Sequence, residues 1–143
     1  MTQATNKPTK PKILSGVYRI TCLANNKNYI GSSDNIMRRL KTHERELNEG
    51  SHNNRRLQHD YDKYGSEFFE FRVVFIDIPK EKLTAYEKVA IYLYDSIVMY
   101  KGYNDIWPTT NHKMFKEAYQ DLLEKGLIPN RKDWLGLLFL WNS

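Results

Sequence analysis

The chain has 143 residues, 41% of them hydrophobic and 13% aromatic, which suits one globular domain and leaves no room for a second large one. A single cysteine, Cys22, excludes an internal disulfide and a cysteine-based zinc cluster. The longest apolar run, residues 134–141, is far shorter than the ~20 residues of a membrane-spanning helix. The polar N-terminus lacks the apolar segment of a secretory signal. We therefore expect a cytoplasmic protein that does not enter membranes.

The formal net charge of +5 is unevenly distributed. Residues 1–65 hold twelve lysines and arginines against six acids, a balance of +6, whereas residues 66–143 hold ten against eleven, a balance of −1. This asymmetry favours an anionic partner, most commonly nucleic acid. Residues 1–12 are polar, basic and broken by prolines, so we predict a disordered basic arm there.

A hairpin is predicted near the N-terminus. Residues 16–22 are rich in strand formers, a second strand begins at residues 28–31, and residues 24–27 carry the asparagines of a turn. If Leu23 pairs with Asn28, then Tyr29 lies opposite Cys22 on the face that carries Tyr18.

Two helices are predicted next. Residues 34–48 carry apolar or half-apolar positions at helical spacing, with Asp34 as N-cap and Gly50 as stop. Arg39 and His43 are four residues apart, so they share a face close to the apolar edge. Residues 55–64 form the second helix, which ends at Gly65, and His52 lies at its start.

Residues 68–78 are predicted to form a buried central strand, and residues 80–100 a helix of about five turns. Glu87 lies beside the apolar stripe of that helix, where a carboxylate needs a cation, a metal or hydrogen-bond donors. A helix is expected over residues 113–125. The apolar residues 134–141 are expected to cover the core or a sheet edge, or to form a dimer interface.

Each candidate site residue also has a structural explanation. Strand tyrosines usually serve packing, and an arginine commonly pairs with an acid. The four histidines lack the paired spacing of a helical zinc motif. In combination, however, a base-capable phenol, a phosphate-binding arginine and a lone carboxylate are what metal-assisted phosphodiester cleavage requires.

Two triplets extend this interpretation. Gly16-Val17-Tyr18 and Tyr29-Ile30-Gly31 resemble the two signature triplets of the GIY-YIG nucleases, with valine replacing isoleucine in the first. The resemblance continues through Arg39, His43, His52, Glu87 and residues 102–104, and so covers roughly residues 14–105. His43 departs from branches of the family that carry tyrosine at its place, and the chain is most similar to the branch of the GIY-YIG homing endonucleases.

This resemblance implies an α/β (α+β) fold, a small three-stranded antiparallel sheet flanked by helices, over residues 13–105. Residues 106–143 would form a short helical C-terminal extension that packs on the domain or makes a homodimer or partner interface. Glu87 would bind one Mg²⁺ or Mn²⁺, Arg39 would hold the scissile phosphate and Tyr18 would be the general base. Tyr29 and His43 would support nucleophile and phosphate, with His52 as a further catalytic candidate. The expected nucleic-acid contacts are Lys27, Ser32, Arg38, Lys41, Arg55, Arg56 and Asn104.

The function expected from these residues is that of a metal-dependent endonuclease acting on double-stranded DNA, of the free-standing kind found in phages and mobile elements. No element for base readout is recognisable, so relaxed sequence preference is expected. The alternatives are a non-catalytic nucleic-acid-binding protein on the same fold, and a nuclease acting on RNA or branched DNA.

Overall fold

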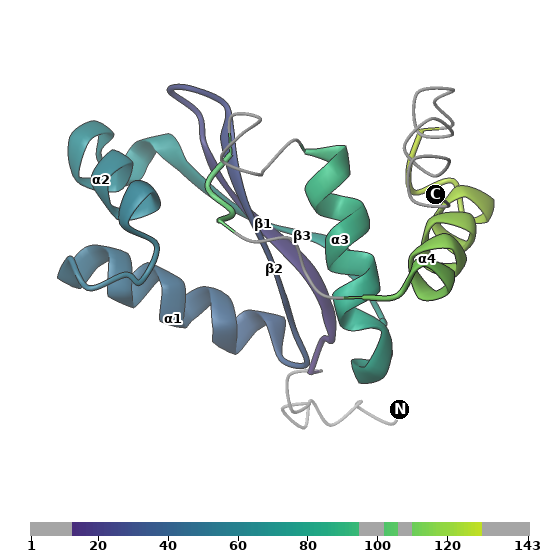
Figure 1. Ribbon diagram of the computed structural model, residues 1–143. Helices are drawn as coiled ribbons and strands as arrows, with labels where there is room; N and C mark the ends of the chain where they lie inside the picture. Colours follow the sequence, from purple (N-terminus) through teal and green to yellow (C-terminus); the bar gives the residue numbers. More distant parts are fainter. Residues whose placement is uncertain (1–12, 95–101, 106–109, 130–143) are drawn as a thin grey trace, which may run out of the picture.

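A three-stranded antiparallel sheet lies at the centre of the computed structural model, which describes residues 13–94, 102–105 and 110–129 (Figure 1). The strand order is β2-β1-β3. The strands are β1 (Gly16–Cys22), β2 (Lys27–Ser33) and β3 (Phe69–Ile76). The helices are α1 (Ile36–Glu49), α2 (Arg55–Tyr64), α3 (Leu83–Leu93) and α4 (His112–Glu124), and short 3-10 turns cover Ser66–Phe68 and Lys80–Lys82. The α+β prediction is confirmed.

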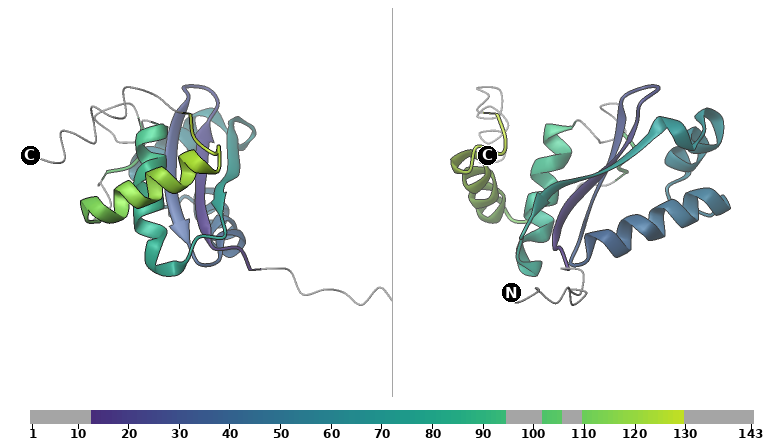
Figure 2. Two further views of the ribbon diagram at one scale, coloured as in Figure 1. Left: turned by 90° about the vertical axis from the view of Figure 1, so that its right-hand side faces the viewer. Right: turned by 180° about the vertical axis from the view of Figure 1, so that it is seen from behind.

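The helices form layers on both faces of the sheet. Helices α1 and α2 cover one face, α3 covers the other, and α4 lies outside α3 (Figures 1 and 2). One core cluster joins α3 and α4 to Val17 and Ile30 of the sheet, and two smaller clusters join the opposite face to α1 and α2. Within the described ranges, no helix has the length and apolar character needed to cross a membrane.

The hairpin register differs from the predicted one. Cys22 pairs with Lys27, and Ile20 rather than Cys22 lies opposite Tyr29. The cause is a four-residue loop that Asn26 closes in the left-handed region, at φ 60°, while the main-chain N–H of Lys27 donates to Oδ1 of Asn25. The shift is two residues, so the faces are preserved and Tyr29 still shares a face with Tyr18.

Helix α1 begins one residue later than predicted, because Asn35 and not Asp34 is its N-cap. The side chain of Asn35 accepts from the main-chain N–H of Arg38 at 3.2 Å. Gly50 ends the helix at φ 75°, as predicted. The predicted bounds of α2 are confirmed, and Asn54 caps its start.

Strand β3 is an edge strand, so the prediction of a buried central strand is wrong. The central position belongs to β1, which bonds to β2 on one side and β3 on the other. Val73 and Ile76 of β3 are 38% and 50% exposed. Hydrophobic composition alone could not separate an edge strand with apolar side chains from a central one.

Helix α3 is shorter than predicted. It ends at Leu93, where the main-chain N–H of Tyr94 bonds back to the carbonyls of Ala90 and Tyr92, and residues 95–101 lie outside the described ranges. The expected fourth helix is present as α4, whose buried residues pack in the cluster that contains α3. The apolar segment 134–141 lies outside the described residues.

Two glycines of the hairpin are required by close contacts. Tyr18 pairs with Gly31 across the ladder, and its phenol ring lies over that glycine, so an added Cβ at Gly31 would overlap the ring. A Cβ at Gly16 would overlap the carbonyl of Phe75, next to the irregularity in the ladder between β1 and β3 at Val17/Tyr18. At both positions a neighbouring group lies too close to the backbone for any side chain, so each triplet requires its glycine.

We expect Gly31→Ala to lower the free energy of unfolding by about 1–3 kcal/mol, because the added methyl group must push the Tyr18 ring aside. Urea denaturation measures the change. Ser33→Ala, at a half-buried position two residues along the same strand, is the control and should cost less. A Gly31→Ala variant as stable as wild type would show that the ring is free to move.

Candidate active site

Three segments of the chain place the rings of Tyr18, His43 and His52 in a row on the face of the sheet that α1 covers. The hydroxyl of Tyr18 on β1 lies 2.7 Å from Nε2 of His43 on α1. The other ring nitrogen of His43, Nδ1, lies 2.7 Å from Nε2 of His52, in the loop before α2. His43 is fully buried and His52 is 5% exposed. The three side chains thus form one continuous hydrogen-bonded chain inside the protein.

Burial determines the protonation state of this row. It lowers the pKa of His43 to about 3, with further lowering by the charges of Arg39 and His52, and it also lowers the pKa of His52. Burial raises the pKa of Tyr18, and the nearby Tyr29 raises it further. The adjacent Arg39 guanidinium lowers the same pKa. Both histidines are therefore neutral near pH 7, and the phenol needs positive charge nearby to give up its proton.

Tyr29 and Arg39 complete this side of the site. The ring of Tyr29 makes edge contacts with His43 and His52, with centroids 5.3 and 6.0 Å apart. Arg39 lies one turn before the buried His43 on α1, and as a whole residue it is exposed. Its guanidinium lies close enough to Tyr18 to hydrogen-bond it. Arg39 therefore reaches the phenol from outside and can also meet a phosphate from solvent.

Glu87 comes from the opposite layer, on α3. It is half-buried, and burial raises its pKa to about 7, while a hydrogen bond from Ser32 lowers it. Its charge raises the pKa of both Tyr18 and Tyr29, so the carboxylate lies within electrostatic reach of both phenols. Among the residues that the structure describes, no salt bridge includes Glu87.

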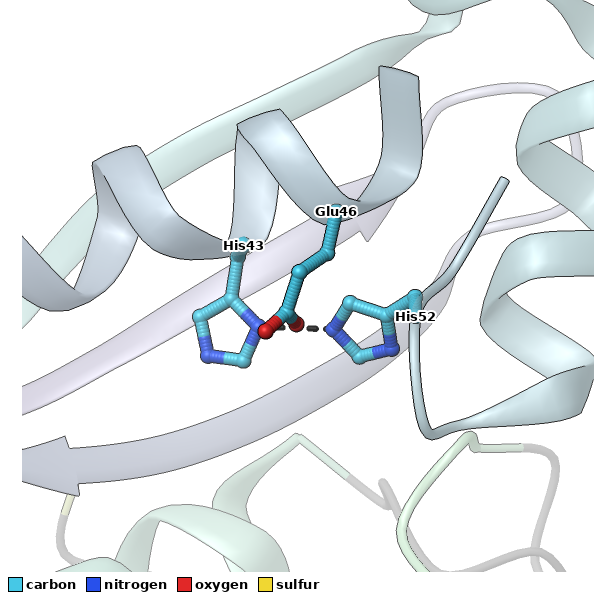
Figure 3. A group of neighbouring side chains, drawn as sticks. All are labelled: His43, Glu46 and His52. Atoms are coloured by element: carbon cyan, nitrogen blue, oxygen red, sulfur yellow. Dashed lines mark hydrogen bonds between the residues drawn. The ribbon is translucent and has the colours of Figure 1, made fainter. Parts of the chain in front are cut away.

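Two places could hold a metal ion. His43, Glu46 and His52 place three ligand-type atoms within 4.8 Å of one another (Figure 3). However, the two facing ring nitrogens of the histidines share a proton at 2.7 Å, so they cannot both offer a lone pair in this state. Glu87 fits a cation better, because it is a carboxylate with a raised pKa and no charged partner among the described residues.

The predicted nucleic-acid contacts fall into two groups. Arg38 and Lys41 line a surface groove beside α1, and Arg45 lines it too, although it was not among the predicted residues. Four of the others, Lys27, Ser32, Arg56 and Asn104, have partners within the protein. Arg56 pairs with Asp105 at 2.7 Å, Lys27 lies over the Tyr103 ring at 6.0 Å, and Arg55 is exposed at the start of α2.

Asn104 was expected to contact nucleic acid, but in the structure it also has a role in the fold. Its side-chain amide bonds both to the N–H and to the carbonyl of Ile30 at 2.8 Å, along the outer edge of β2. Both ends of the amide are thereby engaged. Asn54 was not predicted as a site residue. Its main-chain N–H donates to Nδ1 of His52, a contact that leaves no signal in the sequence.

Comparison with known proteins shows where this arrangement recurs. A model of the GIY-YIG catalytic domain matches residues 14–104. Intron-associated endonuclease 1 of Enterobacteria phage T4 is 33% identical over 90 residues, which are 63% of this chain and 36% of that protein. The chain thus matches only about a third of that relative's length.

Two solved structures are similar. One is a mutant of the catalytic domain of intron endonuclease I-TevI, with a TM-score of 0.60 and 31% identity, covering 69% of this chain and all of that one. The other is the catalytic domain of homing endonuclease I-TevI, with a TM-score of 0.58 and 32% identity, covering 64% of this chain and 98% of that one. All of α4 lies beyond the residues matched by the family model.

We expect Glu87→Gln to make the protein more stable than wild type at pH 8, by up to about 3 kcal/mol. The folded-state pKa of Glu87 is raised above its unfolded value. At low pH the carboxyl is neutral in both states and costs no stability, and wild type loses folding free energy as the pH rises through about 7. The difference between variant and wild type should therefore vanish by about pH 4.

Urea denaturation at pH 4, 6 and 8, with EDTA present, measures this difference. Glu81→Gln is the control, since Glu81 is exposed in the 3-10 turn just before the same helix. A difference for Glu87→Gln that does not change with pH would contradict the burial of its charge.

Proposed function

The chain belongs to the GIY-YIG family, and on that premise we propose that it is a metal-dependent endonuclease that hydrolyses phosphodiester bonds in DNA. The observation that carries the proposal is the convergence of a phenol, a guanidinium and a partly buried carboxylate from three separate elements. Tyr18, Arg39 and Glu87 come from β1, α1 and α3, and their charges affect one another. A fold that only bound nucleic acid would not need a carboxylate with a raised pKa beside the phosphate-binding groups.

In this proposal the phenolate oxygen of Tyr18 accepts a proton from the attacking water. The water oxygen forms the new bond to phosphorus, and the bond from phosphorus to the leaving oxygen breaks in line with it. Arg39 binds the non-bridging oxygens of the scissile phosphate from the solvent side. Tyr29 packs against both histidines and keeps the row in place.

Glu87 would hold a divalent cation, Mg²⁺ or Mn²⁺, with Ser32 orienting the carboxylate through its hydroxyl. A bound cation would supply charge stabilisation to the phosphate and the leaving oxygen. The raised pKa of Glu87 means that protons compete with the metal below about pH 7.

Cleavage assays test this function. Linear, supercoiled, single-stranded and branched DNA and RNA are incubated with the protein in Mg²⁺ or in EDTA. Tyr18→Phe and Glu87→Gln should each lower the rate of Mg²⁺-dependent cleavage about a hundredfold or more, since one removes the base and the other the charged metal ligand.

Tyr64→Phe is the matched control, because Tyr64 is half-buried and packs with the cluster that joins α2 to the sheet. It should cut at a rate close to wild type. Binding without cleavage on every substrate would point to a non-catalytic binding protein, and cleavage of RNA or branched DNA alone would change the substrate.

The groove beside α1 supplies the substrate path in this proposal. Arg38, Lys41 and Arg45 lie at intervals of three and four, so they line one side of the helix, and Arg39 lines the same groove. Cations in such a row bind phosphates without reading the bases. This fits the expected weak sequence preference.

We expect replacement of Arg38, Lys41 and Arg45 by alanine to lower the affinity for DNA. The affinity of the variant should also depend less strongly on salt concentration. The slope of log K against log salt should fall in magnitude by about 0.9 for each phosphate that the variant no longer neutralises. Fluorescence anisotropy in EDTA between 50 and ~200 mM salt measures the slope. A triple alanine variant of the exposed residues Lys82, Lys113 and Lys116 is the control, because Lys113 and Lys116 lie on α4 and Lys82 directly precedes α3, away from the groove beside α1. Equal slopes for the two triple variants would place the DNA elsewhere.

The biological setting proposed for the protein is the cytoplasm of a cell that hosts a phage or mobile element. The alternative to weak sequence preference is specificity supplied by a second copy or a partner protein, with residues 106–143 as the contact. Helix α4, within that extension, packs in the cluster that contains α3.

A further inference from the structure

The main-chain N–H of Asn54 defines where the protons lie on His52. It donates to Nδ1 of His52 at 3.0 Å. A main-chain N–H can only donate, so Nδ1 must offer a lone pair. A neutral imidazole carries one proton, which therefore lies on Nε2 of His52.

The proton on Nε2 of His52 determines the proton positions in the rest of the row. Nε2 of His52 faces Nδ1 of His43 at 2.7 Å, so that Nδ1 accepts and the proton of His43 lies on its Nε2. Nε2 of His43 in turn faces the hydroxyl oxygen of Tyr18 at 2.7 Å. Both rings are neutral near pH 7, because burial lowers the pKa of each.

We infer that the main-chain N–H of Asn54 sets one direction for this hydrogen-bond chain, so that His43 donates to the oxygen of Tyr18. In catalysis, which rests on the proposed function, His43 then supports the phenolate form of Tyr18 instead of removing its proton. His52 and Asn54 are positioning residues that keep the donor on His43.

The reversed chain would leave buried hydrogen-bond donors without an acceptor. It would place a proton on Nδ1 of His52, facing the N–H of Asn54, and two buried donors would then lack an acceptor. The surrounding structure resists a shift that would relieve this. The main-chain N–H of His52 donates to Oε1 of Gln58 at 3.1 Å, and the side chain of Asn54 caps α2 and donates to the carbonyl of Tyr103 at 2.6 Å.

A donor at this position favours charge on the phenol oxygen. When negative charge develops on Tyr18, the hydrogen bond from His43 becomes charge-assisted and strengthens. Arg39 lies on the same phenol. Two donors therefore converge on the atom that must carry charge, one from the buried row and one from the surface.

Nitrogen NMR of the histidine rings tests the direction without any need for activity. The double variant His59→Gln, His112→Gln leaves His43 and His52 as the only histidines, since the chain has four. In the ¹⁵N-histidine-labelled full chain near pH 7, we expect both rings to be neutral and protonated on Nε2. A ring protonated on Nδ1 at either residue would overturn the inference.

A matched pair of variants tests the catalytic consequence. Leucine at position 43 removes the donor, whereas glutamine offers a side-chain N–H near the place of Nε2. We expect His43→Leu to cut DNA about tenfold to a hundredfold more slowly than wild type, and His43→Gln to recover much of that loss. Equal losses would overturn the donor role, because a glutamine amide cannot act as a base.

The two tests separate the inference from the proposed function. A wild-type protein that cuts no substrate in Mg²⁺ would reject the nuclease proposal, and the nitrogen spectra would still decide the direction of the chain.

Discussion

The contact of the Tyr18 ring with Gly31 is the constraint from which the rest of the site follows. The hairpin register places these two residues opposite each other, and the missing side chain lets the phenol lie across the neighbouring strand. Only in that position does the hydroxyl reach His43 on α1 and come within reach of charges from both layers. A register shifted by one residue would turn the phenol to the other face and separate it from the histidines.

The site uses both faces of the sheet. Tyr18, Tyr29 and the histidines lie on the side of α1, whereas Glu87 comes from α3 and is bonded to Ser32. Side chains alternate along β2, so Ser32 and its neighbour Gly31 point to opposite faces. The sheet therefore keeps the histidine row, which is neutral, apart from the carboxylate, which must be able to ionise.

Much of this arrangement could be predicted from the sequence. Period and capping residues placed α1, α2 and α4 to within two residues, because local propensity and burial agree there. The position of β3 at the sheet edge could not be predicted, since strand order depends on long-range pairing. The register failed for a local reason, the left-handed Asn26 and the side-chain bond of Asn25. The role of Asn54 depends on a main-chain group that every residue except proline carries, so composition could not reveal it.

Asn104 has a consequence for what can approach the sheet. Its amide offers Ile30 one donor and one acceptor, as a residue of a neighbouring strand would. The main-chain N–H of Tyr103 adds a further bond, to the carbonyl of Asn28. The backbone of β2 is therefore saturated at these residues, and an extended peptide cannot add to it there without displacing Asn104.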